Sequence, residues 1–227
     1  MLKRQYFRFF AVTFLIPAVI AIQGATAEPL QNISTVIIDA GHGGRDLGVK
    51  NSNAAIEKNI VRKLAIALKR EIISENGESV KVVFTRPGKN DATQEERAYI
   101  ANSNKGDIYI SLHTASGFGK DAHDLGIFIF EEKPGASWET ANLAHLEQSL
   151  LLAGSIKEHL NILYPYKKFV TRRGNFIPLH GIDMPAVLIE VAGLNDPRDE
   201  LEISGKDFHI KFSKAIYSAL IEYGINR

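Results

Sequence analysis

The stretch Thr35-Val-Ile-Ile-Asp-Ala-Gly-His-Gly-Gly44 decides how this chain folds. Its opening run, Thr35 to Asp39, is mostly β-branched and apolar, which predicts a buried strand. The run then enters a glycine-rich loop that carries His42. A buried strand that delivers a histidine into a loop is typical of an α/β protein, in which chemistry is concentrated at the strand ends.

Apolar runs alternate with helical patterns along the rest of the chain. Further strands are predicted at residues 80–84, 108–112, 126–130 and 186–189, and helices from Glu57 to about Asn76, from Thr93 to about 105, over about 139–160, after Pro197 and over 208–223. Strands that alternate with helices predict a mostly parallel twisted sheet with helices on both faces. We therefore expect a single α/β catalytic domain over residues 35–227.

The first 27 residues have a different composition. Three basic residues, an apolar run and a group of small residues follow one another there: Lys3, Arg4 and Arg8, then Phe9 to Ile22, then Ala25-Thr-Ala27. This pattern predicts a secretory signal peptide over residues 1–27 and a short leader over residues 28–34. An uncleaved membrane anchor is the alternative, but the apolar run is shorter than the ~20 residues that span a bilayer. We expect an exported, periplasmic or extracellular monomer without stable membrane insertion after cleavage.

Composition narrows the functions that the chain can have. A chain of 227 residues with 45% hydrophobic and 23% charged residues has the make-up of one soluble globular domain. Removal of residues 1–27 would leave 24 basic against 26 acidic residues, a net charge of −2, which gives no support for nucleic-acid binding. The chain has no cysteine, so metal ligands must be histidine and carboxylate side chains.

Four side chains stand at the edges of the predicted elements. They are His42 after the first strand, Glu57 at a helix start, His113 after the third strand and Glu190 after the fifth. Two imidazoles and one carboxylate make a catalytic zinc site with an open position, and a second carboxylate can serve as the base. The four residues therefore indicate metal-assisted hydrolysis.

Each residue also has a simpler interpretation. His42 could be a turn residue in an anion-binding loop, and Glu57 could complement the positive end of its helix. His113 could be a hydrogen-bonded histidine at a strand end, and Glu190 could pair with an arginine. The loop at His42 does not match a phosphate-binding loop, because no Gly-Lys-Ser/Thr follows it.

Taken together, the motifs resemble the zinc-dependent N-acetylmuramoyl-L-alanine amidases of the amidase 3 family. The resemblance runs from about Thr35 to Gly224. The segments that carry it are Val36-Ile-Ile-Asp-Ala-Gly-His-Gly-Gly44, Glu57-Lys-Asn-Ile60, Phe84-Thr-Arg86, Glu95-Glu-Arg97, Ala101-Asn102, Ser111-Leu-His113, Asp183-Met-Pro-Ala-Val-Leu-Ile-Glu190, Asn195-Asp-Pro197 and Asp199-Glu200.

The resemblance implies a role for each of the four residues. His42, Glu57 and His113 would ligate zinc (Zn2+), and Glu190 would be the catalytic carboxylate that acts as general base. The substrate would be peptidoglycan, and the bond cut would be the amide between N-acetylmuramic acid and the L-alanine of the stem peptide. The chain would thus be a secreted cell-wall hydrolase.

Three features depart from the family pattern. Ala115 stands where the family often has asparagine, and His180 stands where it often has arginine. Glu190 is followed by Val191-Ala-Gly-Leu194 instead of the usual Thr or Leu and Gly-Phe. These departures leave the four catalytic positions intact but affect the predicted substrate contacts.

The segment of residues 131–148 is longer than the corresponding segment of minimal family members. Some relatives carry an inserted helix here that covers the zinc until an activator protein displaces it, and Glu139 or Glu147 could offer the covering carboxylate. The alternative is an ordinary surface helix.

The sequence fits two other functional classes less well. A wall-binding protein that has lost catalysis would not need both metal ligands and a base. Carboxypeptidase-like zinc enzymes place their first His and Glu close together, whereas His42 and Glu57 are widely spaced, and a helical His-Glu-x-x-His motif is absent.

Overall fold

The computed structural model describes residues 29–51, 55–86, 88, 90–115, 125–131, 145–194, 196–203, 205 and 207–227. The predicted signal peptide at residues 1–27 lies outside these ranges, and so do residues 132–144 of the predicted covering segment. No helix within the described ranges is long and apolar enough to span a membrane.

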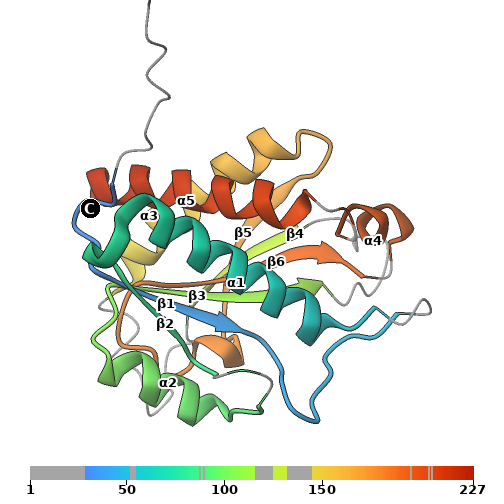
Figure 1. Cartoon of the computed structure of the whole chain (residues 1–227), viewed down its shortest axis with the longest axis horizontal. Helices are drawn as coiled ribbons and strands as arrows, with labels where there is room; N and C mark the ends of the chain where they lie inside the picture. The colour runs from blue at the N-terminus through green and yellow to red at the C-terminus, as the bar shows by residue number, and fades with distance from the viewer. Residues whose placement is uncertain are drawn as a thin grey trace, which may run out of the picture.

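The described residues form one sheet of six strands in the order β2-β1-β3-β6-β4-β5 (Figure 1). The strands are β1 (Thr35–Ala40), β2 (Lys81–Phe84), β3 (Ile108–Ala115), β4 (Leu125–Phe130), β5 (Phe169–Gly174) and β6 (Ala186–Gly193). β1, β2, β3 and β6 run parallel to one another. β4 is antiparallel to β6 and parallel to β5, so the last two strands run against the others. The predicted mostly parallel sheet is confirmed.

Helices cover both faces of this sheet, as predicted (Figure 1). They are α1 (Glu57–Asn76), α2 (Gln94–Ser103), α3 (Leu146–Leu163), α4 (Pro197–Ile203) and α5 (Phe208–Asn226), with short 3₁₀ turns η1 (Gly77–Ser79) and η3 (Ile177–Leu179). The capping box that opens α2 is present: Thr93 and Glu96 each bond to the other's backbone N–H.

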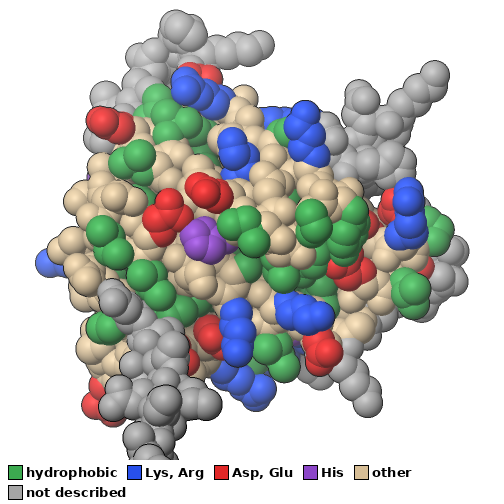
Figure 2. All heavy atoms as spheres, turned by 90° about the horizontal axis from the view of Figure 1, so that it is seen from above, with side chains coloured by type: hydrophobic (Ala, Val, Ile, Leu, Met, Phe, Trp, Pro, Cys, Tyr) green, Lys and Arg blue, Asp and Glu red, His purple; other side chains and the backbone are tan. Residues whose placement is uncertain are grey.

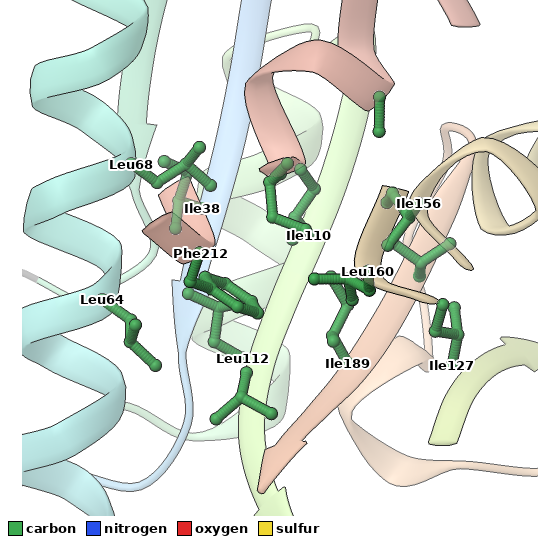
Figure 3. Packing of buried hydrophobic residues seen from close by; sticks show 14 of the residues in the cluster. Ile38, Leu64, Leu68, Ile110, Leu112, Ile127, Ile156, Leu160, Ile189 and Phe212 are labelled. Carbon is green, nitrogen blue, oxygen red and sulfur yellow. The ribbon is translucent and has the colours of Figure 1, made fainter. Parts of the chain in front are cut away.

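The larger core lies between the sheet and the layer formed by α1, α3 and α5. Figure 3 shows where helix and strand side chains meet in it: Leu64, Leu68, Ile156, Leu160 and Phe212 against Ile38, Ile110, Leu112, Ile127 and Ile189. The helical spacing of Leu64 and Leu68 explains why α1 lies flat on the strands. The outer side of the helical layer, seen from above in Figure 2, carries acidic, basic and apolar side chains interspersed.

The opposite face of the sheet carries a smaller core. There Ala98 and Ala101 of α2 and Leu179 of η3 pack on Ile37 and Tyr109. Successive strand residues point to opposite faces of the sheet. The strand side chains on this face therefore alternate along the sequence with those of the larger core. His113 of β3 and Glu190 of β6 lie on this face and line one cavity.

The elements differ from the sequence predictions in three respects. β5 was not predicted, because Thr171, Arg172 and Arg173 break the apolar pattern of this edge strand. β3 and β6 continue past residues 112 and 189, so His113 and Glu190 lie inside strands rather than after them. α3 begins at Leu146 within the described residues, later than the predicted start near 139.

Candidate metal centre

His42 is held in an unusual backbone conformation directly after β1. Its φ is 60°, in the left-handed region where histidine is more common than most residues with a side chain. Its Nδ1 lies 2.8 Å from Asp46 Oδ2, which leaves Nε2 to face Glu57. A carboxylate that holds one imidazole nitrogen in this way is the usual partner of a metal-binding histidine.

Glu57 is the first residue of α1, and it is almost fully buried. Its Oε2 accepts from Val49 N at 2.9 Å, and its Oε1 accepts from Thr114 N at 2.8 Å. Burial alone would raise the pKa of Glu57, but the contacts with the two histidines and the two backbone N–H groups hold it well below its usual range. The side chain is therefore an ionised carboxylate fixed between the histidines.

His113 and Glu190 are neighbours across the sheet. They are register partners in the parallel pair β3–β6, so their side chains share one face. His113 Nδ1 lies 3.2 Å from Glu57 Oε1. Within the described part of the chain, His113 Nε2 is buried without a hydrogen-bond partner.

Two glycines allow these side chains to approach the backbone closely. A Cβ on Gly41 would lie 2.3 Å from the His113 ring, and one on Gly48 would lie 2.6 Å from Glu57 Oε2. A Cβ at either position would displace the side chain that it meets, so glycine allows the observed placement of His113 and Glu57.

The donor set fits a zinc ion. One ligand atom each from His42, Glu57 and His113 can be chosen so that all lie within 4.8 Å of one another. The His42 Nε2–Glu57 Oε2 separation of 3.1 Å is close to the edge of a zinc tetrahedron, about 3.3 Å for bonds of 2.0–2.1 Å. Two imidazoles and a carboxylate leave a fourth position, which is the arrangement of catalytic zinc sites.

Glu190 lines the same cavity, whose volume is about 400 Å³. Burial raises the pKa of Glu190, the charges of His113 and Arg172 oppose that rise, and Glu57 adds to it. Phe128, Phe176 and Leu188 form the apolar part of the lining. The cavity thus combines a metal-binding cluster, a carboxyl group with raised proton affinity and an apolar surface.

A buried ion pair anchors the loop that carries His42. Asp39 accepts from Arg97 Nη1 at 2.6 Å and from Ser111 Oγ at 2.7 Å. The same guanidinium donates from Nη2 to the His42 carbonyl at 2.8 Å. Arg86 Nε donates to the Ala40 carbonyl at 2.6 Å. Arg86 and Arg97 lie in segments that carry the family resemblance, but the resemblance gave neither residue a role. The sequence signal for this buried ion pair was Asp39, a carboxylate inside an apolar strand.

The structure brings His42, Glu57, His113 and Glu190 to one cavity. It does not place His180 among them: His180 lies against the Phe130 ring and contacts Asn175. Glu147 is an exposed residue of α3, and Glu139 lies outside the described residues.

Fold and site together define an α/β domain with a candidate metal centre at the carboxyl ends of its central strands, a class in which metal-dependent hydrolases are common. Comparison with known families agrees. The chain belongs to the N-acetylmuramoyl-L-alanine amidase family, because the family model Amidase_3 matches residues 36–222.

Individual proteins are similar over most of the chain. "Probable cell wall amidase LytH" of Staphylococcus epidermidis is 28% identical over 205 residues, 89% of this chain and 62% of that protein. "N-acetylmuramoyl-L-alanine amidase AmiA" of Salmonella typhimurium is 25% identical over 221 residues, 83% of this chain and 75% of that protein. The chain thus spans less than two thirds of the length of LytH.

A solved structure shows the same fold. The N-acetylmuramoyl-L-alanine amidase from Clostridium difficile 630 superposes with a TM-score of 0.70 at 24% identity, over 85% of this chain and 97% of that one. At this identity the likeness concerns the fold.

Proposed function

We propose that the protein is an exported zinc amidase that cleaves the bond between N-acetylmuramic acid and L-alanine in peptidoglycan. The observation that supports this most directly is the meeting of His42, Glu57 and His113, with Glu190 beside His113 in the neighbouring strand. Membership of the amidase family agrees with this substrate class.

In this proposal His42, Glu57 and His113 hold the zinc ion. Bound zinc would lower the pKa of a water molecule toward 7 and polarise the amide carbonyl. The chain itself supplies the orientation: Asp46 sets the His42 ring, and Val49 and Thr114 fix the Glu57 carboxylate through their N–H groups. A site held this firmly does not have to reorganise when the substrate binds.

Glu190 moves the proton. Its carboxylate accepts a proton from the attacking water, and the same proton is delivered to the amide nitrogen as the carbon–nitrogen bond breaks. The products are a free lactyl carboxylate on the sugar and a free amine on the stem peptide. The raised pKa of Glu190 suits this exchange, because a group that must first accept and then donate works best with a pKa nearer neutrality.

The cellular setting is part of the same proposal. We place residues 1–27 as a signal peptide that exports the domain to the periplasm or the outside of the cell, where peptidoglycan is reached. We also propose a monomer that an activator protein binds. The CwlD amidase of Clostridioides difficile, which has the same fold at a TM-score of 0.67, was solved in complex with the GerS lipoprotein.

Mass spectrometry of fragments released from purified sacculi tests the bond, the substrate and the metal together. The expected products are intact stem peptides with a free L-alanine amine and glycan strands without peptides. Chelation should abolish their release, and added zinc should restore it. Release of disaccharide-linked peptides only, or activity that survives chelation, would contradict the proposal.

A further inference from the structure

Among the described residues, Arg172 is a cation on the same sheet face as Glu190. Leu188 lies opposite Phe128 across the pair β6–β4, and Phe128 lies opposite Arg172 across the pair β4–β5. Residues that face each other in this way project from the same side of a sheet. Leu188, Phe128 and Arg172 therefore form a row that lies one pleat below Glu190 on the face that holds the cavity.

The row is apolar near Glu190 and charged at its far end. Gly126 has no side chain that could fill the space beside Glu190. The Phe128 ring lies over Gly126, and a Cβ on Gly126 would lie 2.1 Å from this ring. Phe176 packs edge-on against Phe128, with ring centroids 4.7 Å apart. Beyond these rings, Arg172 is an exposed residue of the edge strand β5.

Arg172 lies on the cavity side of β5, because its register partner Phe128 lines the cavity. Its neighbour Arg173 projects from the opposite face, where it lies 3.3 Å from Glu131. The two adjacent arginines thus differ in that only Arg172 faces the cavity side.

We propose that Arg172 binds a carboxylate on the second residue of the stem peptide, with the Phe128 ring beneath the alanine. This inference rests on the proposed amidase function. The glycan part of peptidoglycan has no charge for a guanidinium to recognise, whereas an acidic residue with a free carboxylate follows the L-alanine. Arginine is suited to this role because its planar fork matches a carboxylate in two parallel hydrogen bonds.

The spacing agrees with this assignment. Arg172 lies two strand spacings, about 10 Å, across the sheet and about 7 Å along it from Glu190, which is about 12 Å in all. Two extended residues beyond the cleaved bond span about 7 Å, and the long arginine side chain covers the remainder. The peptide would cross the strands toward β5, the edge strand labelled in Figure 1.

The test compares two synthetic muropeptides in which the second residue carries either a free carboxylate or its carboxamide. The zinc-loaded full chain should have a kcat/KM about tenfold higher for the acid than for the amide, mostly through KM, as expected for one charge-assisted hydrogen-bond pair. Arg172→Gln should reduce this ratio to below about twofold. Arg173→Gln, on the opposite face of the same strand, should retain it.

Several outcomes would overturn the inference. A wild-type enzyme without preference for the acid contradicts it before any variant is made, and so does an Arg172→Gln enzyme that keeps the preference. If Arg172→Gln fails to fold by circular dichroism, Arg172→Met preserves the aliphatic packing and takes its place. Inactivity of the wild type on both substrates would instead reject the amidase function, so the two failures are distinguishable.

Discussion

Glu57 Oε2 lies 3.1 Å from His42 Nε2, although one residue opens helix α1 and the other lies in the loop after β1. This contact joins the loop after β1 to the first residue of α1. The loop between them returns to the helix, and Val49 N donates to the same Glu57 oxygen. The candidate metal centre therefore depends on how the loop docks against the start of α1.

His42→Ala should abolish both zinc binding and activity, because it removes one of three proposed ligands. The zinc content of the purified variant, measured by elemental analysis, is expected to fall to near zero. His159→Ala on α3 is the matched control, because His159 contacts Glu222 and the Ser155 carbonyl instead of the cluster. Stoichiometric zinc in His42→Ala would remove His42 from the ligand set.

Glu190→Gln should retain zinc and lose at least about 100-fold in kcat, the typical contribution of a positioned general base. Because the pKa of Glu190 is raised, the acidic limb of the wild-type kcat/KM profile should lie above about 4.3, the usual value for glutamate. Glu222→Gln, on the far side of the sheet, should leave kcat near the wild-type value. Near-normal kcat in Glu190→Gln would exclude it as the base.

Metal removal should lower the thermal stability of the fold. An ion that binds only the folded chain adds about 2.7 kcal/mol when it is present at 100 times its Kd. Differential scanning calorimetry with and without a chelator should show a drop in Tm of several degrees. The same chelator should leave the Tm of His42→Ala unchanged, and an equal drop in that variant would show that the effect does not come from this site.

Asp39→Asn should destabilise the fold by about 3–5 kcal/mol, because it leaves the Arg97 charge buried without its partner. Burial would raise the pKa of Asp39, but the charge of Arg97 and the hydrogen bonds from Thr85, Ser111 and Arg97 hold it below its usual value. A lowered folded-state pKa means that the ionised carboxylate stabilises the fold above about pH 4, and that this stabilisation is lost as the pH falls through the lower folded value.

Urea unfolding at pH 7 and below pH 4 checks both statements about Asp39. The difference between the wild type and Asp39→Asn should be largest at neutral pH and should shrink in acid. Glu131→Gln, which removes an exposed pair with Arg173, should change the free energy of unfolding by less than about 1 kcal/mol. A pH-independent difference for Asp39→Asn would contradict the expected ionisation.

Gly41→Ala should weaken zinc binding, because its Cβ would lie 2.3 Å from the His113 ring and push the imidazole aside. Isothermal titration calorimetry with zinc should show a loss of affinity of at least about tenfold. This is the lower end of the effects seen when the groups that orient a metal ligand are changed. Gly154→Ala in helix α3 meets nothing within 4 Å and should bind zinc normally. Its helix should even gain up to about 1 kcal/mol.

The strands of the central sheet could be predicted because buried parallel strands appear as nearly continuous apolar runs. Ile108 to Leu112 and Ala186 to Ile189 are such runs. The polar side chains that follow concealed how far these strands continue. His113 and Glu190 tolerate strand positions because their side chains face a cavity instead of the packed core.

Apolar runs did not predict the edge strand β5 or the buried ion pair between Asp39 and Arg97. β5 carries Arg172 and Arg173 on opposite faces, so neither face shows apolar alternation. The pair Asp39–Arg97 joins residues 58 positions apart, and no local pattern indicates which of many arginines meets a given carboxylate. The family resemblance could align these residues but could not supply the contacts between them.

The three donors at the cavity are contributed by a loop, a helix start and a central strand, so an unfolded chain holds no preformed site. A polypeptide that is threaded through a translocation channel before it folds must therefore arrive without its ion. It would acquire zinc only in the compartment where folding is completed. For the exported zinc amidase proposed above, this order of events would prevent hydrolysis before export and would make activity depend on the free zinc level outside the membrane.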